Sequence, residues 1–293
     1  MEVIKVTPRG FCKGVVHAIE TAKKARITYP NQKITILGML VHNQSVVDAL
    51  KSYDIETIDQ KGKSRWDLLD EIKEGVVIFT AHGISENVMK KAIDKGLIIV
   101  DATCEFVSII HEAVKEKLSE GYEVAYIGKK GHPESEAVIS MSPHVHLIEK
   151  IEDFNFQCDK LFVTNQTTLS YETTRSFYEQ IQHLYPHAVL HNEICSATRM
   201  RQEALKNLEH VDALFVVGDP KSHNTQKLLE IGKESADEVY LVENLDQCQN
   251  IDLSSFQKVA VTSGASTPTR ITQQIIQYLE GNNVTKMNIK DII

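Results

Sequence analysis

Short apolar runs alternate along the chain with segments in which apolar residues recur every three or four positions. The runs ITIL (34–37), VAYI (124–127) and LFVV (214–217) are continuous, which is typical of strands buried on both faces of a parallel sheet. The segments between them have the spacing of amphipathic helices with one buried side. Because strand and helix patterns alternate, the sequence predicts an α/β protein.

The whole pattern occurs three times. A glycine follows each of the three runs, and these glycines, Gly38, Gly128 and Gly218, lie 90 residues apart in both steps. A polar residue stands four positions after each glycine: His42, His132 and Ser222. Later in each third, another apolar run ends in a threonine and is followed by a polar motif: AHG (81–83), NQTT (165–168) or SGAST (263–267). A fixed period of this length indicates a structural repeat.

We therefore expect three similar α/β domains with mainly parallel sheets, in a pseudo-three-fold (trefoil) arrangement around a common centre. The expected domains cover 13–103, 104–194, and 195–280 together with 1–12. The first dozen residues are assigned to the third domain because the boundaries fall at repeat positions. Residues 281–293 are expected to form a C-terminal tail.

Three of the five cysteines follow the same repeat. Cys12 and Cys104 are 92 positions apart, and Cys104 and Cys195 are 91 positions apart. Each follows a short strand pattern and precedes a helical pattern. In the third repeat, the buried side of that helix is expected to carry Ala197, Met200, Ala204 and Leu208. Ligands bind beyond the carboxyl ends of parallel strands. A trefoil therefore directs all three thiols toward one central point.

The chemistry of three such thiols favours an iron–sulfur cluster. A disulfide framework is not expected, because the five cysteines are an odd number in a chain expected to be cytoplasmic. Cys158 and Cys248 lie outside the repeat and are expected to be inert. Three thiolates could hold zinc with a fourth ligand, but the closely spaced C-x2-C pairs of zinc sites are absent from the sequence. Three thiolates suit a [4Fe–4S] cluster with one iron left open as a Lewis acid.

The strand-end motifs have the composition of an anion site. Histidine, serine, threonine and asparagine beside helix N-termini bind phosphate through side chains, backbone N–H groups and the helix dipole. The sequence contains neither GxxxxGK[ST] nor GxGxxG, so a substrate diphosphate is favoured over ATP or NAD. Glu134 is the carboxylate within a strand-end motif and is the candidate general acid.

Composition excludes several classes of function. Hydrophobic residues make up 42% and charged residues 25% of the 293 positions, as in ordinary globular proteins. The net charge of −8 and the pI of about 5.9 argue against binding of nucleic acid or an anionic membrane. No apolar run is long enough to span a bilayer, and the N-terminus does not have the pattern of a secretory signal. A cytoplasmic location is therefore expected.

The motifs together resemble the 4-hydroxy-3-methylbut-2-enyl diphosphate reductase (IspH/LytB) family, in order and across nearly the whole chain. The matching segments are PRGFCKGV (8–15), VHN (41–43), AHG (81–83), DATC (101–104), GHPE (131–134), QTTL (166–169), IC-x-AT-x3-Q (194–202), SHNT (222–225) and GAS-x-P (264–268).

The resemblance implies an oxidoreductase that catalyses the last step of the non-mevalonate (MEP) pathway of isoprene biosynthesis. It delivers two electrons and two protons to (E)-4-hydroxy-3-methylbut-2-enyl diphosphate, expels water, and yields isopentenyl and dimethylallyl diphosphate. It further implies one [4Fe–4S] cluster per chain, and ferredoxin or flavodoxin as electron donor. The residues implied to act are listed by role: cluster ligands Cys12, Cys104 and Cys195; acid Glu134; and substrate ligands His42, His82, His132, Thr167, Ser222, His223, Asn224 and Ser266.

The sequence departs from the family pattern at three places. His223 stands where the family often has a second serine, Asn165 where threonine is common, and Glu105 where proline is common. His223 is retained as a substrate ligand through its backbone N–H or its side chain.

Two other functions remain as alternatives at this stage. A metal-dependent phosphate-ester hydrolase built on the strand-end histidines would leave the cysteine spacing unexplained. A non-catalytic iron–sulfur sensor would leave the polar motifs and Glu134 unexplained.

Overall fold

A computed structural model describes residues 1–285 and 287–293. The chain divides into two compact units, each described by itself. The first comprises residues 1–16, 41–54 and 196–293, and the second comprises residues 17–40 and 55–195. No helix among the described residues is long and apolar enough to cross a membrane.

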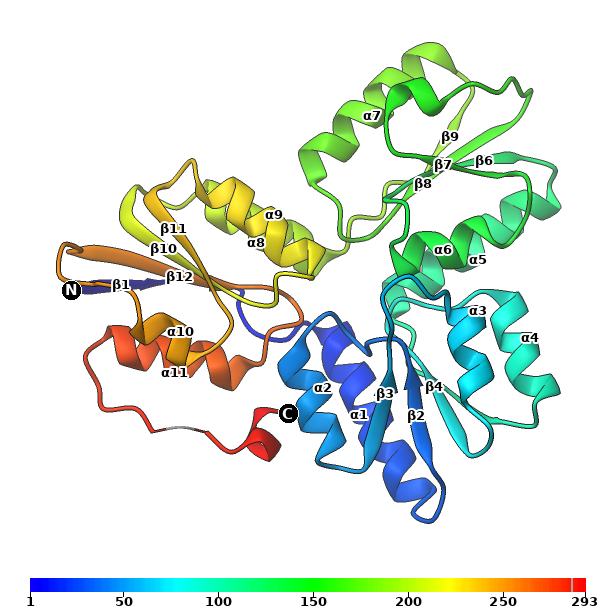
Figure 1. Ribbon diagram of the computed structural model, residues 1–293. Coiled ribbons are helices and arrows are strands. Elements are labelled where there is room, and N and C mark those ends of the chain that lie inside the picture. The colour runs from blue at the N-terminus through cyan, green and yellow to red at the C-terminus, as the bar shows by residue number, and fades with distance from the viewer. Residues whose placement is uncertain (286) are drawn as a thin grey trace. The chain divides into compact units, whose positions relative to one another are not determined.

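The first unit is built on one four-stranded parallel sheet, sheet A, in the order β1-β12-β10-β11. Its strands are β1 (Glu2–Lys5), β10 (Val211–Val217), β11 (Ala236–Val242) and β12 (Lys258–Ser263). Its helices are α2 (Gln44–Lys51), α8 (Ser196–Lys206), α9 (His223–Gly232), α10 (Leu245–Gln249), α11 (Thr269–Leu279) and the 3-10 turn η3 (Ile289–Ile292). The blue N-terminal strand lies beside the orange β12, pairing Glu2 with Lys258 (Figure 1).

The second unit contains two more parallel sheets, sheet B in the order β3-β2-β4-β5 and sheet C in the order β7-β6-β8-β9. Sheet B consists of β2 (Ile34–Leu37), β3 (Ile55–Ile58), β4 (Val76–Phe79) and β5 (Ile98–Asp101); sheet C consists of β6 (Glu123–Ile127), β7 (Val145–Ile148), β8 (Leu161–Asn165) and β9 (Val189–Leu190). The helices and 3-10 turns are α3 (Arg65–Leu68), η1 (Leu69–Glu71), α4 (Glu86–Asp94), α5 (Glu105–Ser119), α6 (Pro133–Ile139), η2 (Ile151–Asp153) and α7 (Tyr171–Leu184). Helix α1 (Lys13–Thr28) has residues in both units.

The three sheets have the same topology. In each, the strand that ends at the repeated glycine is second from the edge, and the strand before a cysteine forms the other edge. The expected fold class, three similar α/β substructures each with a parallel sheet, is confirmed. Each sheet has four strands where the pattern indicated three per repeat, because β3, β7 and β11 had no clear signal. These strands lie at sheet edges, where polar residues are tolerated and the continuous apolar pattern is lost.

Alternation along the central strands explains why sheet A is covered on both faces. Ala213, Phe215 and Val217 pack with α11, whereas Leu214 and Val216 pack with α8 and α9. Sheet C repeats this arrangement, with α5 and α6 on one face and α7 on the other (Figure 1). All polar strand-end motifs therefore extend from fully packed sheets, which hold their backbones in place.

The buried face of α8 differs from the expected one. Met200 is 50% exposed, while Thr198, Arg201 and Gln202 are buried. The expectation followed the apolar residues, but Arg201 faces inward because its guanidinium donates to the Gly10 carbonyl in the loop before Cys12 and to the Ser263 carbonyl at the end of β12.

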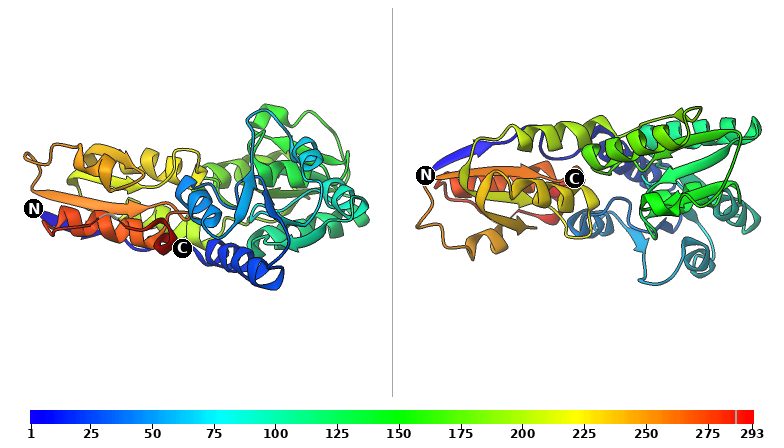
Figure 2. Two further views of the ribbon diagram at one scale, coloured as in Figure 1. Left: turned by 60° about the horizontal axis from the view of Figure 1, so that its bottom comes forward. Right: turned by 90° about the horizontal axis from the view of Figure 1, so that it is seen from above.

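The last turn of the chain, η3, lies within the expected C-terminal tail. Turn η3 packs against α2, near the marked C-terminus (Figure 2). The Tyr53 hydroxyl donates to the Lys290 carbonyl at 3.4 Å. The Gln274 side chain also donates to the Thr285 carbonyl at 2.7 Å.

Candidate active site

The three repeat cysteines share one backbone anchor. Each stands immediately before a helix, and its N–H donates to a carbonyl of the polar motif that follows the neighbouring strand of the same sheet. The pairs are Cys12 with Ala265 (3.0 Å), Cys104 with Ala81 (3.0 Å) and Cys195 with Thr167 (3.1 Å). All three cysteines are half-buried. The sequence repeat thus corresponds to a repeated local structure, which fixes the backbone position of each cysteine.

The loop before Cys12 is held by buried polar contacts. Gly10 has a φ of +77°, and a Cβ there would lie 2.4 Å from Thr269 Oγ1, so only glycine fits. The Gly10 N–H donates to Ser263 Oγ at 2.6 Å. Arg201, 2% exposed, donates to the Gly10 carbonyl at 2.6 Å and to the Ser263 carbonyl at 3.3 Å. These contacts tie the Cys12 loop to the end of β12.

Cys12 belongs to the first unit, and Cys104 and Cys195 belong to the second. Within the described residues, no group of three or more His, Cys, Asp or Glu side chains is arranged to hold a metal ion. The other two cysteines have thiols that favour the protonated form. Burial raises the pKa of Cys248 to about 12, and burial also raises the pKa of Cys158. Protonated thiols are poor metal ligands.

Glu134 lies in the first turn of α6 and is 1% exposed. Its Oε1 accepts from the Thr167 N–H at 2.8 Å and from the Tyr126 hydroxyl at 3.3 Å, and its Oε2 accepts from Thr167 Oγ1 at 3.0 Å. Burial raises the pKa of Glu134 to about 7, although these hydrogen bonds favour the carboxylate. A carboxyl with that pKa exchanges a proton near neutral pH, as a general acid requires.

Two of the predicted histidines lie together in the second unit. The rings of His82 and His132 are edge-to-face, with centroids 5.7 Å apart. His132 is the N-cap of α6, and its Nδ1 accepts from the Glu134 N–H at 3.2 Å. A neutral His132 therefore carries its proton on Nε2 and donates from that atom. The structure thus brings two imidazoles, the Glu134 carboxyl and Thr167 into one region.

The side-chain amide of Asn224 is buried and unsatisfied. It lies in the first turn of α9 and is 3% exposed, and neither its Oδ1 nor its Nδ2 has a hydrogen-bond partner among the described residues. Ser222 caps the same helix, its Oγ accepting from the Thr225 N–H at 3.3 Å. An unsatisfied buried amide costs about 1–3 kcal/mol. A ligand at this helix N-terminus would remove that cost.

Two further contacts organise the first unit. Ser266 Oγ donates to the His42 carbonyl at 2.9 Å, which joins the SGAST and VHN motifs. Asp219 accepts from the Gln44 N–H at 2.8 Å and from the Lys221 N–H at 2.8 Å. His42, Ser222, Asn224 and Ser266 thereby share one unit with Cys12.

The three departures from the family pattern lie at different places. His223 is the first residue of α9 and is half-buried, beside Ser222 and Asn224. Asn165 is buried, and its Oδ1 accepts from the Tyr178 hydroxyl at 2.8 Å. Glu105 begins α5 and is exposed.

Sequence reasoning missed Tyr126 and Arg201. Tyr126 lies within a continuous apolar strand, and a buried tyrosine hydroxyl usually has a partner, so its presence there was a usable signal. Arg201 had a weaker signal. It lies six residues after Cys195, in a predicted helix that has few apolar residues to form a buried side.

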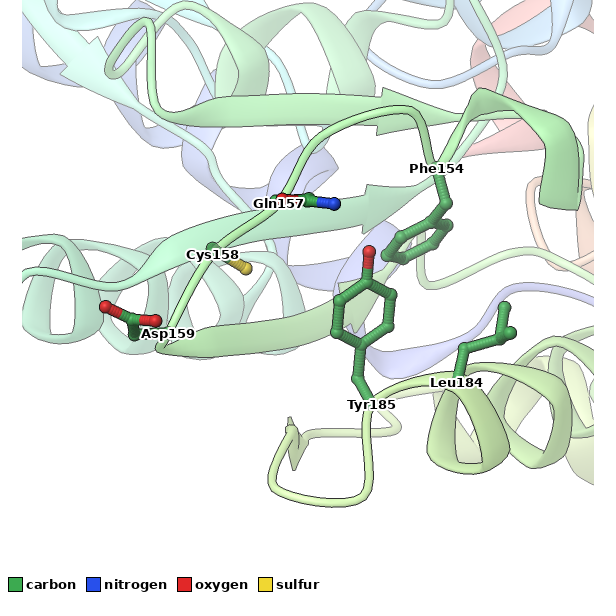
Figure 3. Close-up of a pocket in the computed structure, with 6 residues that line it drawn as sticks. All are labelled: Phe154, Gln157, Cys158, Asp159, Leu184 and Tyr185. Atoms are coloured by element: carbon green, nitrogen blue, oxygen red, sulfur yellow. The ribbon is translucent and has the colours of Figure 1, made fainter.

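A cavity of about 610 Å³ lies beside sheet C and apart from these groups. Its lining is formed by Phe154, Gln157, Cys158, Asp159, Leu184 and Tyr185 (Figure 3). Phe154 and Tyr185 face each other there, with ring centroids 5.8 Å apart. None of the predicted site residues lines this cavity.

The fold and the strand-end site place the chain with diphosphate reductases. The structure of the E-1-hydroxy-2-methyl-but-2-enyl-4-diphosphate reductase from Plasmodium falciparum superimposes with a TM-score of 0.85 and 31% identity, covering 99% of this chain and 96% of that one. A second solved structure, an (E)-4-hydroxy-3-methyl-but-2-enyl diphosphate reductase described as the terminal enzyme of the non-mevalonate pathway, has a TM-score of 0.69 and 29% identity over 96% of this chain and all of that one.

This chain belongs to the LytB protein family, whose model matches residues 3–280. The 4-hydroxy-3-methylbut-2-enyl diphosphate reductase of Symbiobacterium thermophilum is 46% identical over 292 residues, covering 97% of this chain and 98% of the relative.

Proposed function

We propose that this protein reduces (E)-4-hydroxy-3-methylbut-2-enyl diphosphate to isopentenyl and dimethylallyl diphosphate. The C–O bond to the hydroxyl breaks, two electrons and one proton form the new C–H bond, and a second proton leaves with the hydroxyl as water. Membership of the LytB family and the names of its relatives support this reaction. The relatives are reductases, so the hydrolase alternative has no support from them.

The observation that carries the proposal is the pairing of Glu134 with Thr167. Protonated Glu134 donates from Oε2 to Thr167 Oγ1, which reverses the hydrogen bond made by the carboxylate. The Thr167 hydroxyl then passes its own proton to the leaving hydroxyl group. Because the pKa of Glu134 is about 7, roughly half of the molecules hold this proton at neutral pH.

We assign the diphosphate to the strand-end histidines and to the α9 N-terminus. His82 and His132 donate from neutral imidazoles, and the unsatisfied Asn224 amide gains a partner when an anion binds. The remaining members of the proposed cradle are His42, Ser222, His223 and Ser266. Ser266 donates to the His42 carbonyl in the structure, so its hydroxyl either turns on binding or positions His42.

We propose that Cys12, Cys104 and Cys195 hold one [4Fe–4S] cluster. The donor set fits this group, because three thiols with the same backbone anchor precede three helices. When bound, the cluster supplies the electrons of the reduction, and its fourth iron carries no cysteine. We further propose that a cytoplasmic ferredoxin or flavodoxin reduces it.

Anaerobic turnover of the allylic diphosphate with a reduced electron donor tests the function. We expect both five-carbon diphosphates from the wild type and none from a Cys104→Ser variant. Release of inorganic phosphate without either product would favour a hydrolase and refute the proposal.

A further inference from the structure

The guanidinium of Arg65 contacts the AHG motif through the Gly83 carbonyl. Arg65 is the first residue of α3, and its guanidinium reaches across the end of sheet B. Nη1 donates to the Gly83 carbonyl at 2.7 Å, and Nη2 donates to Thr80 Oγ1 at 2.8 Å. Burial lowers the pKa of Arg65 to about 10, so the side chain still carries its charge at neutral pH.

Thr80 connects this cation to His82. Thr80 is fully buried, and its Oγ1 lies 3.3 Å from His82 Nδ1. Since Arg65 has only donors, Oγ1 accepts from it and keeps its own proton to give away. Within the described part of the chain, the only acceptor in hydrogen-bond geometry with that proton is His82 Nδ1. The opposite assignment would bury a hydroxyl proton without an acceptor, at a cost of about 1–3 kcal/mol.

Arg65 occupies a position where the other two repeats have a different side chain. A Cβ on Gly128 would lie 2.6 Å from Ser135 Oγ, and a Cβ on Gly218 would lie 2.5 Å from Thr225 Oγ1. At the equivalent Gly38, the nearest atom is Arg65 Nε at 3.2 Å, and the φ of Gly38 is +89°. The first repeat therefore has a guanidinium where the other two have a hydroxyl.

The tautomer of the neighbouring imidazole, His132, is set by a different group. A backbone N–H fixes the tautomer of His132, so no side-chain change elsewhere is needed to set it. At His82, the group 3.3 Å from Nδ1 is the side-chain hydroxyl of Thr80. Both rings then present Nε2–H, which is the donor that a phosphate oxygen requires.

We propose that Arg65 is a positioning residue that acts through Thr80 to hold His82 as the Nε2–H tautomer, so that His82 donates to the substrate diphosphate. The identity of the ligand rests on the proposed function, whereas the tautomer is a property of the protein without substrate. The two ideas therefore fail in different experiments.

The tautomer is measured by ¹⁵N NMR of histidine-labelled, cluster-loaded protein, with the His82 signals assigned from a His82→Asn variant. We expect a protonated Nε2 and an unprotonated Nδ1 in the wild type and in Thr80→Ser. Thr80→Val, which keeps the shape and removes the hydroxyl, should give a mixture of both tautomers. A proton on Nδ1 in the wild type, or an unchanged tautomer in Thr80→Val, would overturn the proposal.

Binding of inorganic pyrophosphate to the same protein measures the consequence. Arg65→Met should weaken binding, and raise the KM for the allylic diphosphate, by about 2- to 10-fold with a smaller change in kcat, because only the molecules with the proton on His82 Nε2 remain competent to bind. Arg65→Lys, which keeps the charge without the two-armed contact, should recover only part of the affinity.

Lys91→Gln is the matched control, because Lys91 binds the Trp66 carbonyl and Asp70 of the same segment and should leave binding unchanged. Equal losses in Lys91→Gln and Arg65→Met would mean that charge alone acts, and the proposal would be wrong. Absence of turnover in the wild type would count against the proposed function but not against the tautomer.

Discussion

Replacement of Glu134 by glutamine tests the buried acid through stability as well as activity. Glutamine has the shape of protonated glutamate: its Oε1 accepts from the Thr167 N–H, and its Nε2 donates to Thr167 Oγ1. The variant therefore keeps the hydrogen bonds and the packing, and it removes only the proton exchange and the cost of burying a charge.

The size of that cost follows from the pKa of Glu134, which is raised from 4.5 to about 7 in the folded protein. A raised carboxyl pKa means that folding disfavours the charged form. The penalty is absent below pH 4.5, grows as the pH rises, and is complete above pH 7. Linkage gives about 1 kcal/mol at pH 5.5 and about 3 kcal/mol at pH 8.5. Glu134→Gln should therefore gain roughly 2 kcal/mol relative to the wild type between these pH values.

The assay is urea unfolding of both proteins at the two pH values, without oxygen, together with kcat from pH 6 to pH 9. The wild-type kcat should fall above pH 7 as Glu134 loses its proton, while the variant should be nearly inactive and independent of pH. Equal stability differences at pH 5.5 and pH 8.5 would refute the raised pKa. Near-normal kcat in the variant would remove Glu134 from catalysis.

Three further predictions concern the cysteines, the Cys12 loop and the anion site. Cys104→Ser should lose bound iron, whereas Cys248→Ser should keep it, as measured by iron content after anaerobic purification; full loading of the first variant would contradict the cluster assignment. Arg201→Met should lower iron content several-fold, because the Gly10 carbonyl loses its partner; unchanged iron and unchanged absorption of the cluster would show that the loop is held without it. Asn224→Leu should raise the KM about 10-fold or more and should not destabilise the substrate-free protein, because its amide has no partner there within residues 1–285 and 287–293; an unchanged KM would exclude it from the cradle.

Local pattern was sufficient for the central strands of each sheet. Continuous apolar runs such as 34–37 and 214–217 predict buried parallel strands because both faces must be covered. The edge strands β3, β7 and β11 were missed because polar residues such as Glu56, His146 and Glu238 interrupt their apolar pattern, which an edge position tolerates.

The candidate site was predicted as a set of residues without its contacts. The motif match named Glu134 and Thr167, but not that Tyr126 completes the set of donors around the carboxyl. It also did not give the guanidinium contacts of Arg65 and Arg201, because a charged side chain is expected at the surface unless a specific acceptor draws it inward.

The sequence by itself determined the repeat, the choice of three cysteines among five, and the residue types at each strand end. A period of about ninety residues is a property of the chain and needs no coordinates. Only the tertiary structure decided the protonation chemistry. The pKa of Glu134 depends on burial by distant residues, and the proton position on His82 depends on Thr80 and, through it, on Arg65. Those effects act through space, over packed contacts that sequence distance does not encode.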